Sequence, residues 1–110
     1  MFRPGDVVKV EFLGAQGIKR RPAVVLSSEL YHECRPDLLV GLITGNVATA
    51  VHPSDYILRD WEVAGLVVPC AFRCFIQTYS KAEVRLTGRL SKSDIEGVAL
   101  AVSAAVGVLP

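Results

Sequence analysis

Residues 19–27 read Lys19-Arg20-Arg21-Pro22-Ala23-Val24-Val25-Leu26-Ser27 and place three cations directly before a continuous apolar run. Such a run predicts a buried strand, so the three charges are held on rigid backbone at its start. The net charge of the whole chain is only +1, which argues against a broad basic surface for nucleic acid. Any nucleic-acid site must therefore be local, with residues 19–21 as its candidate. The alternative is a charge run that only solubilises the end of a strand.

Short periodic segments surround this stretch and are separated by Gly, Pro, Asn and Ser residues. Residues 7–12 alternate between apolar and polar side chains, as a half-buried strand does. Residues 23–26 and 38–43 are continuously apolar, which predicts two strands in the middle of the sheet, covered on both faces. Residues 66–77 predict a strand bent at Pro69, and residues 83–90 predict the last strand.

From Ser91 onward the apolar residues follow a helical period, with Ser93 and Glu96 in capping-box register. The apolar positions of this helix are Ile95, Val98, Ala99, Val102 and Val106. Strands followed by one terminal helix predict a mainly β fold with a C-terminal helix, in which a twisted antiparallel sheet curls into a small barrel.

The bulk composition limits the organisation and location of the protein. A chain of 110 residues predicts a single domain over residues 1–110. Its 51% hydrophobic content exceeds what a small monomer needs, so we expect a homodimer. The chain starts without a secretory signal, and its longest uncharged stretch, residues 97–110, is shorter than the ~20 residues of a membrane span. We therefore expect a cytoplasmic protein without a membrane partner, with its three cysteines reduced.

Five motifs are spread along the chain: Arg3-Pro4-Gly5-Asp6-Val7-Val8, residues 19–27, Leu42-Ile43-Thr44-Gly45-Asn46, Asp60-Trp61-Glu62-Val63-Ala64-Gly65-Leu66 and Gly88-Arg89-Leu90-Ser91. Together they resemble the MazF/PemK family of toxin endoribonucleases over nearly the whole chain. The resemblance implies an SH3-like barrel of the MazF/CcdB type. It also implies a type II toxin that cleaves single-stranded RNA at specific sequences and so inhibits translation and growth.

The resemblance further implies that Arg21 is the principal catalytic residue and that Thr44 is the second. The implied reaction uses no metal and no cofactor: the ribose 2′-hydroxyl attacks the adjacent phosphate, which leaves a 2′,3′-cyclic phosphate and a 5′-hydroxyl. A guanidinium suits this chemistry because its fixed donors stabilise the charge that develops on phosphate oxygens.

Other residues are expected to bind the substrate. Lys19 and Arg20 suit neighbouring phosphates, and Asn46 suits a base edge. Arg73 and Gln77 share one face of their strand, from which Arg73 can reach the cleft. Some relatives carry an Asp two residues after this Arg, where this chain has Phe75, so an acid/base pair within that strand is not expected here. A surface or dimer-interface role for Arg73 is an equal alternative.

The loop of residues 13–18 contains no Glu or His for proton transfer, which leaves His32 and His52 as possible bases. Solvated loop histidines are the simpler interpretation for both, and His52 is the better candidate. His32, Cys34, Cys70 and Cys74 offer zinc-ligand chemistry. However, cysteines four residues apart on one strand lie ~13 Å apart, too far for one metal. Trp61 is expected to pack rather than to stack on RNA.

The resemblance also implies a MazE-like antitoxin whose acidic tail occupies the RNA groove. Two other classes stay open for this chain. One is a CcdB-like gyrase poison on the same fold, although the tail Val106-Gly107-Val108-Leu109-Pro110 lacks the aromatic and acidic residues such proteins use. The other is an interaction module without catalytic activity.

Overall fold

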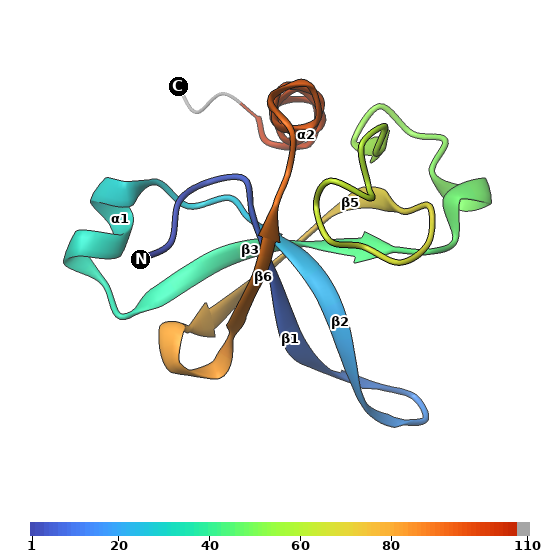
Figure 1. Ribbon diagram of the computed structural model, residues 1–110. Coiled ribbons are helices and arrows are strands. Elements are labelled where there is room, and N and C mark those ends of the chain that lie inside the picture. The colour runs from blue at the N-terminus through green and yellow to red at the C-terminus, as the bar shows by residue number, and fades with distance from the viewer. Residues whose placement is uncertain (108–110) are drawn as a thin grey trace.

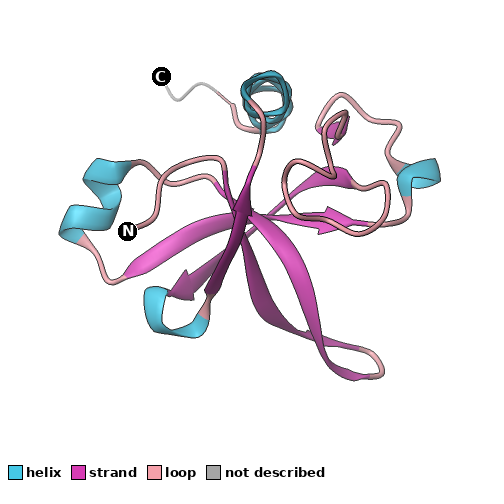
Figure 2. Cartoon of the chain, viewed as in Figure 1, coloured by secondary structure: helices cyan, strands magenta, loops and turns pink. Residues whose placement is uncertain are grey.

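The computed structural model describes residues 1–107, which form one six-stranded antiparallel sheet with helices around it (Figures 1 and 2). The strands lie in the order β4-β5-β3-β2-β1-β6. Their bounds are β1 Asp6–Gly14, β2 Gly17–Val25, β3 Asp37–Thr44, β4 Asp55–Ile57, β5 Ala71–Ser80 and β6 Arg85–Arg89. The helices are α1 Glu29–Cys34 and α2 Lys92–Ala105, and short 3-10 turns cover Val47–Thr49 and Lys81–Glu83. None of the helices in the described range combines the length and the apolarity needed to cross a bilayer.

The two continuously apolar segments form β2 and β3, the central strands of the sheet, as predicted. Consecutive residues of β2 enter different clusters: Val24 packs beneath α2, whereas Ala23 and Val25 pack on the opposite face. Side chains of a strand alternate between its faces, so a strand buried on both sides must be apolar at every position. This explains why the sequence shows a run there and not an alternation.

The sheet curls into a half-barrel around the second cluster, which consists of Val8, Val10, Ala23, Val25, Leu38 and Val40. The Tyr79 hydroxyl on β5 reaches the carbonyl oxygen of Glu11 on β1, at 3.1 Å, although β3 and β2 lie between these strands in the sheet. Figure 1 shows α2 on one side of the curled sheet and the β1–β2 hairpin projecting on the other. The predicted small barrel with a C-terminal helix is confirmed in this form.

Asp94 attaches the start of α2 to the rest of the fold. Its carboxylate is fully buried and accepts hydrogen bonds from the Tyr56 hydroxyl at 2.8 Å, from Arg59 N–H at 3.0 Å and from Asp60 N–H at 2.9 Å. The N-cap of α2 is Ser91, whose hydroxyl oxygen accepts from Asp94 N–H at 3.2 Å. The prediction that Ser93 and Glu96 cap this helix is therefore wrong. β6 ends at Arg89, so only Leu90 separates it from Ser91, the N-cap of α2.

The strand predicted for residues 66–77 is also wrong at its start. β5 begins at Ala71, and residues 66–70 form a loop in which Val67 and Val68 are exposed. Pro69 has no N–H to give to a ladder, which accounts for the late start. The last predicted strand is shorter than expected because Lys81–Glu83 form a 3-10 turn capped by Ser80 and β6 begins only at Arg85.

Candidate functional site

The strand register places most of the predicted site residues on one face of the sheet. Paired residues of neighbouring strands point to the same side. Arg21 pairs with Val10 and Lys19 with Phe12, so both cations lie on the side of the second cluster. The same face carries Thr44, Arg73 and Gln77: Arg73 pairs with Leu42, Gln77 pairs with Val40, and Thr44 follows Leu42 by two residues.

Arg20 points to the opposite face, where it pairs with Glu11. The side chains of residues 19–21 therefore leave the strand on two sides instead of one. β2 begins at Gly17, so residues 19–21 lie inside a strand and alternate across it. Two of them reach the side of Arg73, and the third reaches the side covered by α2.

Arg21 and Thr44 lie where the two central strands separate. Pairing between β2 and β3 is limited to Ala23↔Leu42, Val24↔Gly41 and Val25↔Val40. Beyond Ala23 and Leu42 the strands diverge, and Arg21 and Thr44 are half-buried on the two sides of the gap. A hollow of about 320 Å³ lies at this gap and is lined by Arg21, Ile43, Gly45 and the loop before β5, among others.

The hydroxyl of Thr44 keeps its proton available. Its Oγ1 atom accepts a hydrogen bond from Asn46 N–H at 3.1 Å, which uses a lone pair and leaves the O–H free to donate. Asn46 begins the 3-10 turn, and its carbonyl accepts from the Thr49 hydroxyl at 3.0 Å. The exposed Asn46 side chain makes no capping hydrogen bond in this turn, so its amide points to solvent uncommitted.

Arg73 has an acidic partner that the sequence did not reveal. Its Nε atom lies 3.9 Å from Oδ1 of Asp55, and the side chain of Asp55 is only 5% exposed against 47% for Arg73. Oδ2 of Asp55 accepts from His52 N–H at 3.2 Å, which fixes the carboxylate. β4, which carries Asp55, is only three residues long, too short for a recognisable periodic pattern.

A pocket of about 390 Å³ surrounds this ion pair and is lined by Leu42, His52, Ser54, Asp55, Arg73, Cys74 and Phe75. Phe75 is 52% exposed, so its ring offers a stacking surface. Burial raises the pKa of the Cys74 thiol, and the carboxylate of Asp55 raises it further. The pocket therefore combines one partly exposed guanidinium, one buried carboxylate and an aromatic ring.

Gln77 is already in contact with another side chain. Its Oε1 atom lies 2.9 Å from the Tyr79 hydroxyl, which also donates to Glu11 across the half-barrel. This contact helps to hold β5 against β1 in the curled sheet. Its assignment to substrate binding stays a prediction.

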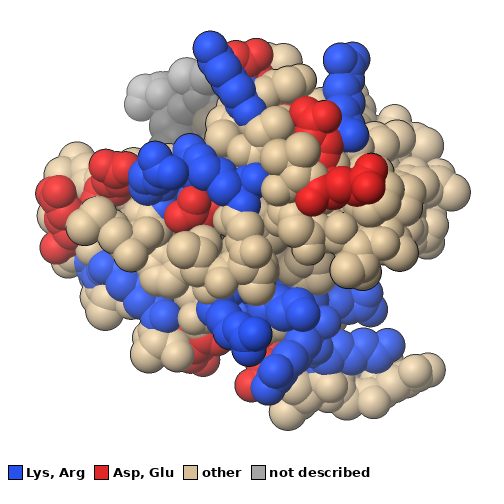
Figure 3. All heavy atoms as spheres, in the orientation of Figure 1, with Lys and Arg blue, Asp and Glu red and all other residues tan. Residues whose placement is uncertain are grey.

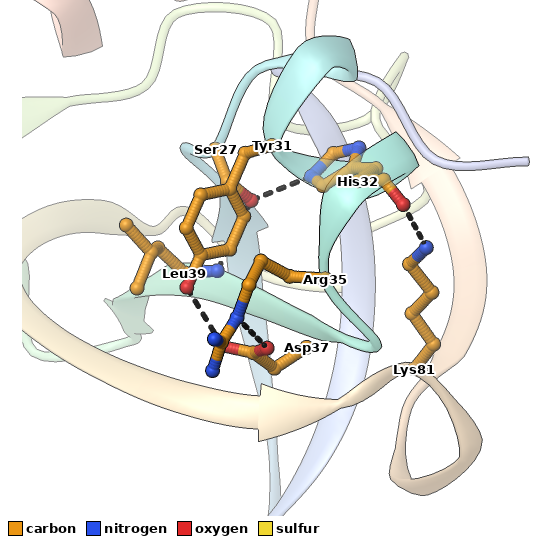
Figure 4. A network of polar contacts seen from close by, with 7 residues as sticks. All are labelled: Ser27, Tyr31, His32, Arg35, Asp37, Leu39 and Lys81. Carbon is orange, nitrogen blue, oxygen red and sulfur yellow. Dashed lines mark hydrogen bonds and ion pairs between the residues drawn. The ribbon is translucent and has the colours of Figure 1, made fainter.

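The two histidines lie in different surroundings, and Figure 4 shows those of His32. His32 was expected in a solvated segment, but it is buried: its Nδ1 lies 3.0 Å from the Phe2 carbonyl and its Nε2 lies 2.6 Å from Ser27 Oγ. A carbonyl can only accept, so Nδ1 carries the proton and Nε2 accepts from Ser27. Ser27 in turn accepts from Leu39 N–H at 3.0 Å. Both ring nitrogens are thus committed to the fold, whereas His52 is exposed at the Arg73 pocket.

The same region contains a second polar contact group. Asp37 accepts from the Tyr31 hydroxyl at 2.7 Å and pairs with Arg35 at 3.2 Å, and the ammonium of Lys81 donates to the His32 carbonyl (Figure 4). These contacts attach α1 to β3 and to the turn before β6. On this side of the molecule the polar side chains stabilise the fold.

Metal-ligating side chains do not converge within residues 1–107: no group of three His, Cys, Asp or Glu residues is placed to hold an ion. Cys34, Cys70 and Cys74 are free thiols. Burial raises the pKa of the Cys70 thiol, whose Sγ donates to the Val68 carbonyl at 3.2 Å. Trp61 packs against the cluster beneath α2, as expected.

Solved structures of similar fold include proteins from mycobacteria and from Deinococcus radiodurans. An endoribonuclease in complex with its cognate antitoxin from Mycobacterial species is 15% identical, with a TM-score of 0.77, and the match covers 96% of this chain and 94% of that one. MazE-MazF (Form-II) from Deinococcus radiodurans is 16% identical, with a TM-score of 0.72 and coverage of 98% and 97%. The Mycobacterium tuberculosis toxin MazF-mt6 is 25% identical, with a TM-score of 0.71 and coverage of 94% and 95%.

The fold is thus the curled sheet with C-terminal helix of MazF structures. The family model of PemK-like, MazF-like toxins of type II toxin–antitoxin systems matches residues 3–106, and the chain belongs to this family. The comparison with curated protein sequences found no match. The resemblance noted from the motifs is confirmed.

Proposed function

We propose that this protein is a sequence-specific endoribonuclease that cleaves single-stranded RNA without a metal ion, as the toxin of a type II toxin–antitoxin system. The observation that carries the proposal is the position of Arg21 and Thr44 at the two sides of the gap between β2 and β3. Family membership supports the activity, since a structural neighbour of similar fold is named an endoribonuclease.

The reaction assigned to this gap is transesterification followed by release. The 2′-oxygen of a ribose forms a bond to its own 3′-phosphorus, and the bond from phosphorus to the 5′-oxygen of the next nucleotide breaks. The 2′-proton leaves to a base, and a proton is delivered to the departing 5′-oxygen. The products are a 2′,3′-cyclic phosphate and a 5′-hydroxyl, so no water is consumed in this step.

Arg21 acts in this scheme as a fixed donor to the non-bridging phosphate oxygens. Its half-buried position reduces solvent screening, which strengthens its interaction with the extra negative charge of the transition state. Thr44 donates its free hydroxyl proton to the same oxygens. His52 lines the Arg73 pocket and is the exposed imidazole available for proton transfer among the described residues.

The Arg73 pocket suits an unpaired base next to the cleaved bond. Phe75 offers a ring for stacking, and the outer donors of the Arg73 guanidinium suit the acceptor edge of a purine. The exposed amide of Asn46 is a second base-reading group. Lys19 lies on the same face and suits a neighbouring phosphate.

The proposed partners are a second copy of this chain and a MazE-like antitoxin with an acidic tail. Support comes from structural neighbours that are named as MazE-MazF complexes and from the cations around the gap. RNA and the antitoxin should compete for this site. RNA binding unchanged in the saturated antitoxin complex would rule out a shared site.

The deciding experiment incubates purified protein with a long single-stranded RNA in EDTA and maps the new 5′ ends. We expect cuts at a short recurring sequence, with 5′ ends that need phosphorylation before ligation and 3′ ends that carry a cyclic phosphate. An Arg21→Ala protein serves as the control for contaminating nucleases. Intact RNA after incubation with folded wild-type protein would favour an interaction module instead.

A further inference from the structure

Lys9 and Arg85 lie directly opposite each other in the pairing of β1 with β6. Both side chains are exposed and point to the face that Arg20 also shares. Like charges directly opposite each other in an antiparallel pair destabilise the sheet. The Lys9–Arg85 pair therefore does not stabilise the sheet.

These cations lack partners of opposite charge. Among residues 1–107, the ion pairs within 4.0 Å are Arg35–Asp37, Arg73–Asp55 and Arg89–Asp6. None of them involves Lys9, Arg20 or Arg85. Glu11 and Glu83 line the same hollow but form no ion pair with these cations, and the Glu83 carboxylate accepts from Ser80 N–H at 2.8 Å. Three cations against two carboxylates leave the hollow with a net positive charge.

Two neighbouring hollows lie along these cations, one beside β6 and one at the gap beside Arg21. One hollow of about 210 Å³ is lined by Arg85, Lys9 and Arg20, together with Glu83 and neighbouring residues. The hollow of about 320 Å³ at the gap is lined by Lys9, Arg20 and Arg21. Lys9 and Arg20 line both hollows, so the two hollows are neighbours on the surface. Figure 3 shows lysine and arginine side chains gathered on this side of the molecule, over β1 and β2.

We propose that Arg20, Lys9 and Arg85, here called the cation track, bind the phosphates of an RNA strand as it leaves the gap at Arg21. The proposal rests on the proposed function and adds two residues, Lys9 and Arg85, to its substrate contacts. A strand with its reacting phosphate at Arg21 has further phosphates on either side. Two residues of the cation track, Lys9 and Arg20, line the same hollow as Arg21, so their unpaired charges lie close to these phosphates.

RNA is the favoured occupant over a second copy of this chain. A two-fold interface centred on the cation track would bring like charges together, which opposes association. An acidic peptide has the right charge, and it becomes one of the outcomes of the test.

The test measures binding of a mixed-sequence RNA oligonucleotide that is 2′-O-methylated throughout, so that it lacks the attacking hydroxyl. Lys9→Gln, Arg85→Gln and the double variant are compared with wild type over a series of salt concentrations. We expect weaker binding, with the slope of log affinity against log salt reduced by about 0.7 for each lost contact. Melting temperatures should stay equal or rise, because the variants relieve the repulsion between Lys9 and Arg85.

Matched controls separate a local site from general charge. Lys92→Gln removes an exposed cation at the start of α2, outside the cation track, and should leave the salt slope unchanged. Lys9→Arg and Arg85→Lys keep the charge and should bind RNA as wild type does. Equal affinity and slope in wild type and the double variant would overturn the proposal, as would an equal loss in Lys92→Gln.

Two further readouts distinguish the alternatives. A poly-glutamate peptide whose binding falls in the track variants while RNA binding does not would overturn the proposal in favour of an acidic peptide site. Cleavage by wild type combined with unchanged RNA binding in the track variants would reject the cation track alone. Weaker RNA binding in these variants, combined with no cleavage by wild type, would support the track and reject the proposed function.

Discussion

The guanidinium of Arg73 on β5 faces the buried carboxylate of Asp55 on β4, with Nε 3.9 Å from Oδ1. Asp55 supplies the negative charge that position 75 of β5 lacks in this chain. The carboxylate is fixed by His52 N–H, whereas the outer part of the arginine remains exposed. Asp55 is therefore placed to orient Arg73, which the next prediction tests.

We predict that Asp55→Asn raises the KM for RNA more than it lowers kcat. The amide oxygen can still accept from His52 N–H, so the turn is kept while the charge that orients Arg73 is lost. Solvent screens the half-exposed Arg73 and the two atoms are 3.9 Å apart, so the free energy of unfolding should change by less than about 1 kcal/mol. Cleavage kinetics and urea denaturation measure the two effects. A parental KM would show that Arg73 needs no such partner.

The same substitution should change the chemistry of a neighbouring thiol. Burial raises the pKa of the Cys74 thiol and the Asp55 carboxylate raises it further, so removing that charge lowers the pKa and increases the thiolate fraction at a given pH. Alkylation of Cys74 in the Asp55→Asn protein should therefore be faster than in wild type. Tryptic mapping assigns the rate to this cysteine, and Cys34, which lies elsewhere on the surface, provides the internal reference.

Arg21→Ala is expected to abolish cleavage while the fold is retained. The substitution removes charge stabilisation of the transition state, a loss of ~10²-fold or more in rate. Arg20→Ala is the matched comparison, since its side chain points to the opposite face. It should weaken binding and reduce the rate far less. An Arg21→Ala protein that cuts at the parental rate would reject the catalytic assignment.

Much of the fold followed from side-chain patterns. The apolar runs of β2 and β3 predicted the middle of the sheet, and the helical period after Ser91 predicted α2. Both signals come from burial, which dictates residue type over several positions. The polar outer half of β2 carries no such signal, so the strand was expected to begin at Ala23 and Arg20 was grouped with Arg21.

The Arg73 pocket could not be predicted because it depends on pairing between distant segments. Asp55 and Arg73 are brought together by the register of β4 against β5. β4 has only three residues, which is too short to show the apolar–polar alternation that identifies a strand. The role of Asp94 was missed for a similar reason. Its partners, Tyr56 and the backbone of residues 59–60, lie far away in sequence, and only the folded chain shows an acidic residue with no solvent exposure.

Asp94→Ala should be the most destabilising of these substitutions. It would leave the partly buried N–H groups of Arg59 and Asp60 without their acceptor and remove the hydrogen bond from Tyr56. A cost of roughly 3 kcal/mol is expected for these charge-assisted hydrogen bonds. Asp94→Asn keeps one acceptor oxygen and should lose less. Urea denaturation of the two variants and wild type measures the difference, and equal stability would contradict the role of this carboxylate.

Tyr56→Phe should change how stability depends on alkaline pH. Burial raises the pKa of the Tyr56 phenol, and its hydrogen bond to Asp94 raises it further. The protonated phenol is therefore favoured by folding, and its contribution is present below the unfolded pKa of about 10 and lost as pH rises through the folded value. Wild type should lose stability above pH ~10 more steeply than Tyr56→Phe. Identical pH profiles would show that Tyr56 is not responsible.

Lys19 and Asn46 are expected to affect RNA cleavage in different ways. Lys19→Ala should lower affinity nearly equally for all sequences and reduce the salt slope by about 0.7, because phosphate contacts position the strand without reading it. Asn46→Ala removes an exposed amide that can pair with a base edge, so it should relax the cleavage motif more than it weakens binding. Mapping of cut sites across a long RNA separates the two effects. If Lys19→Ala changes the motif while Asn46→Ala leaves it intact, positioning and reading are assigned to the wrong residues, and the segment from Thr44 to Asn46 serves the turn that its hydrogen bond closes.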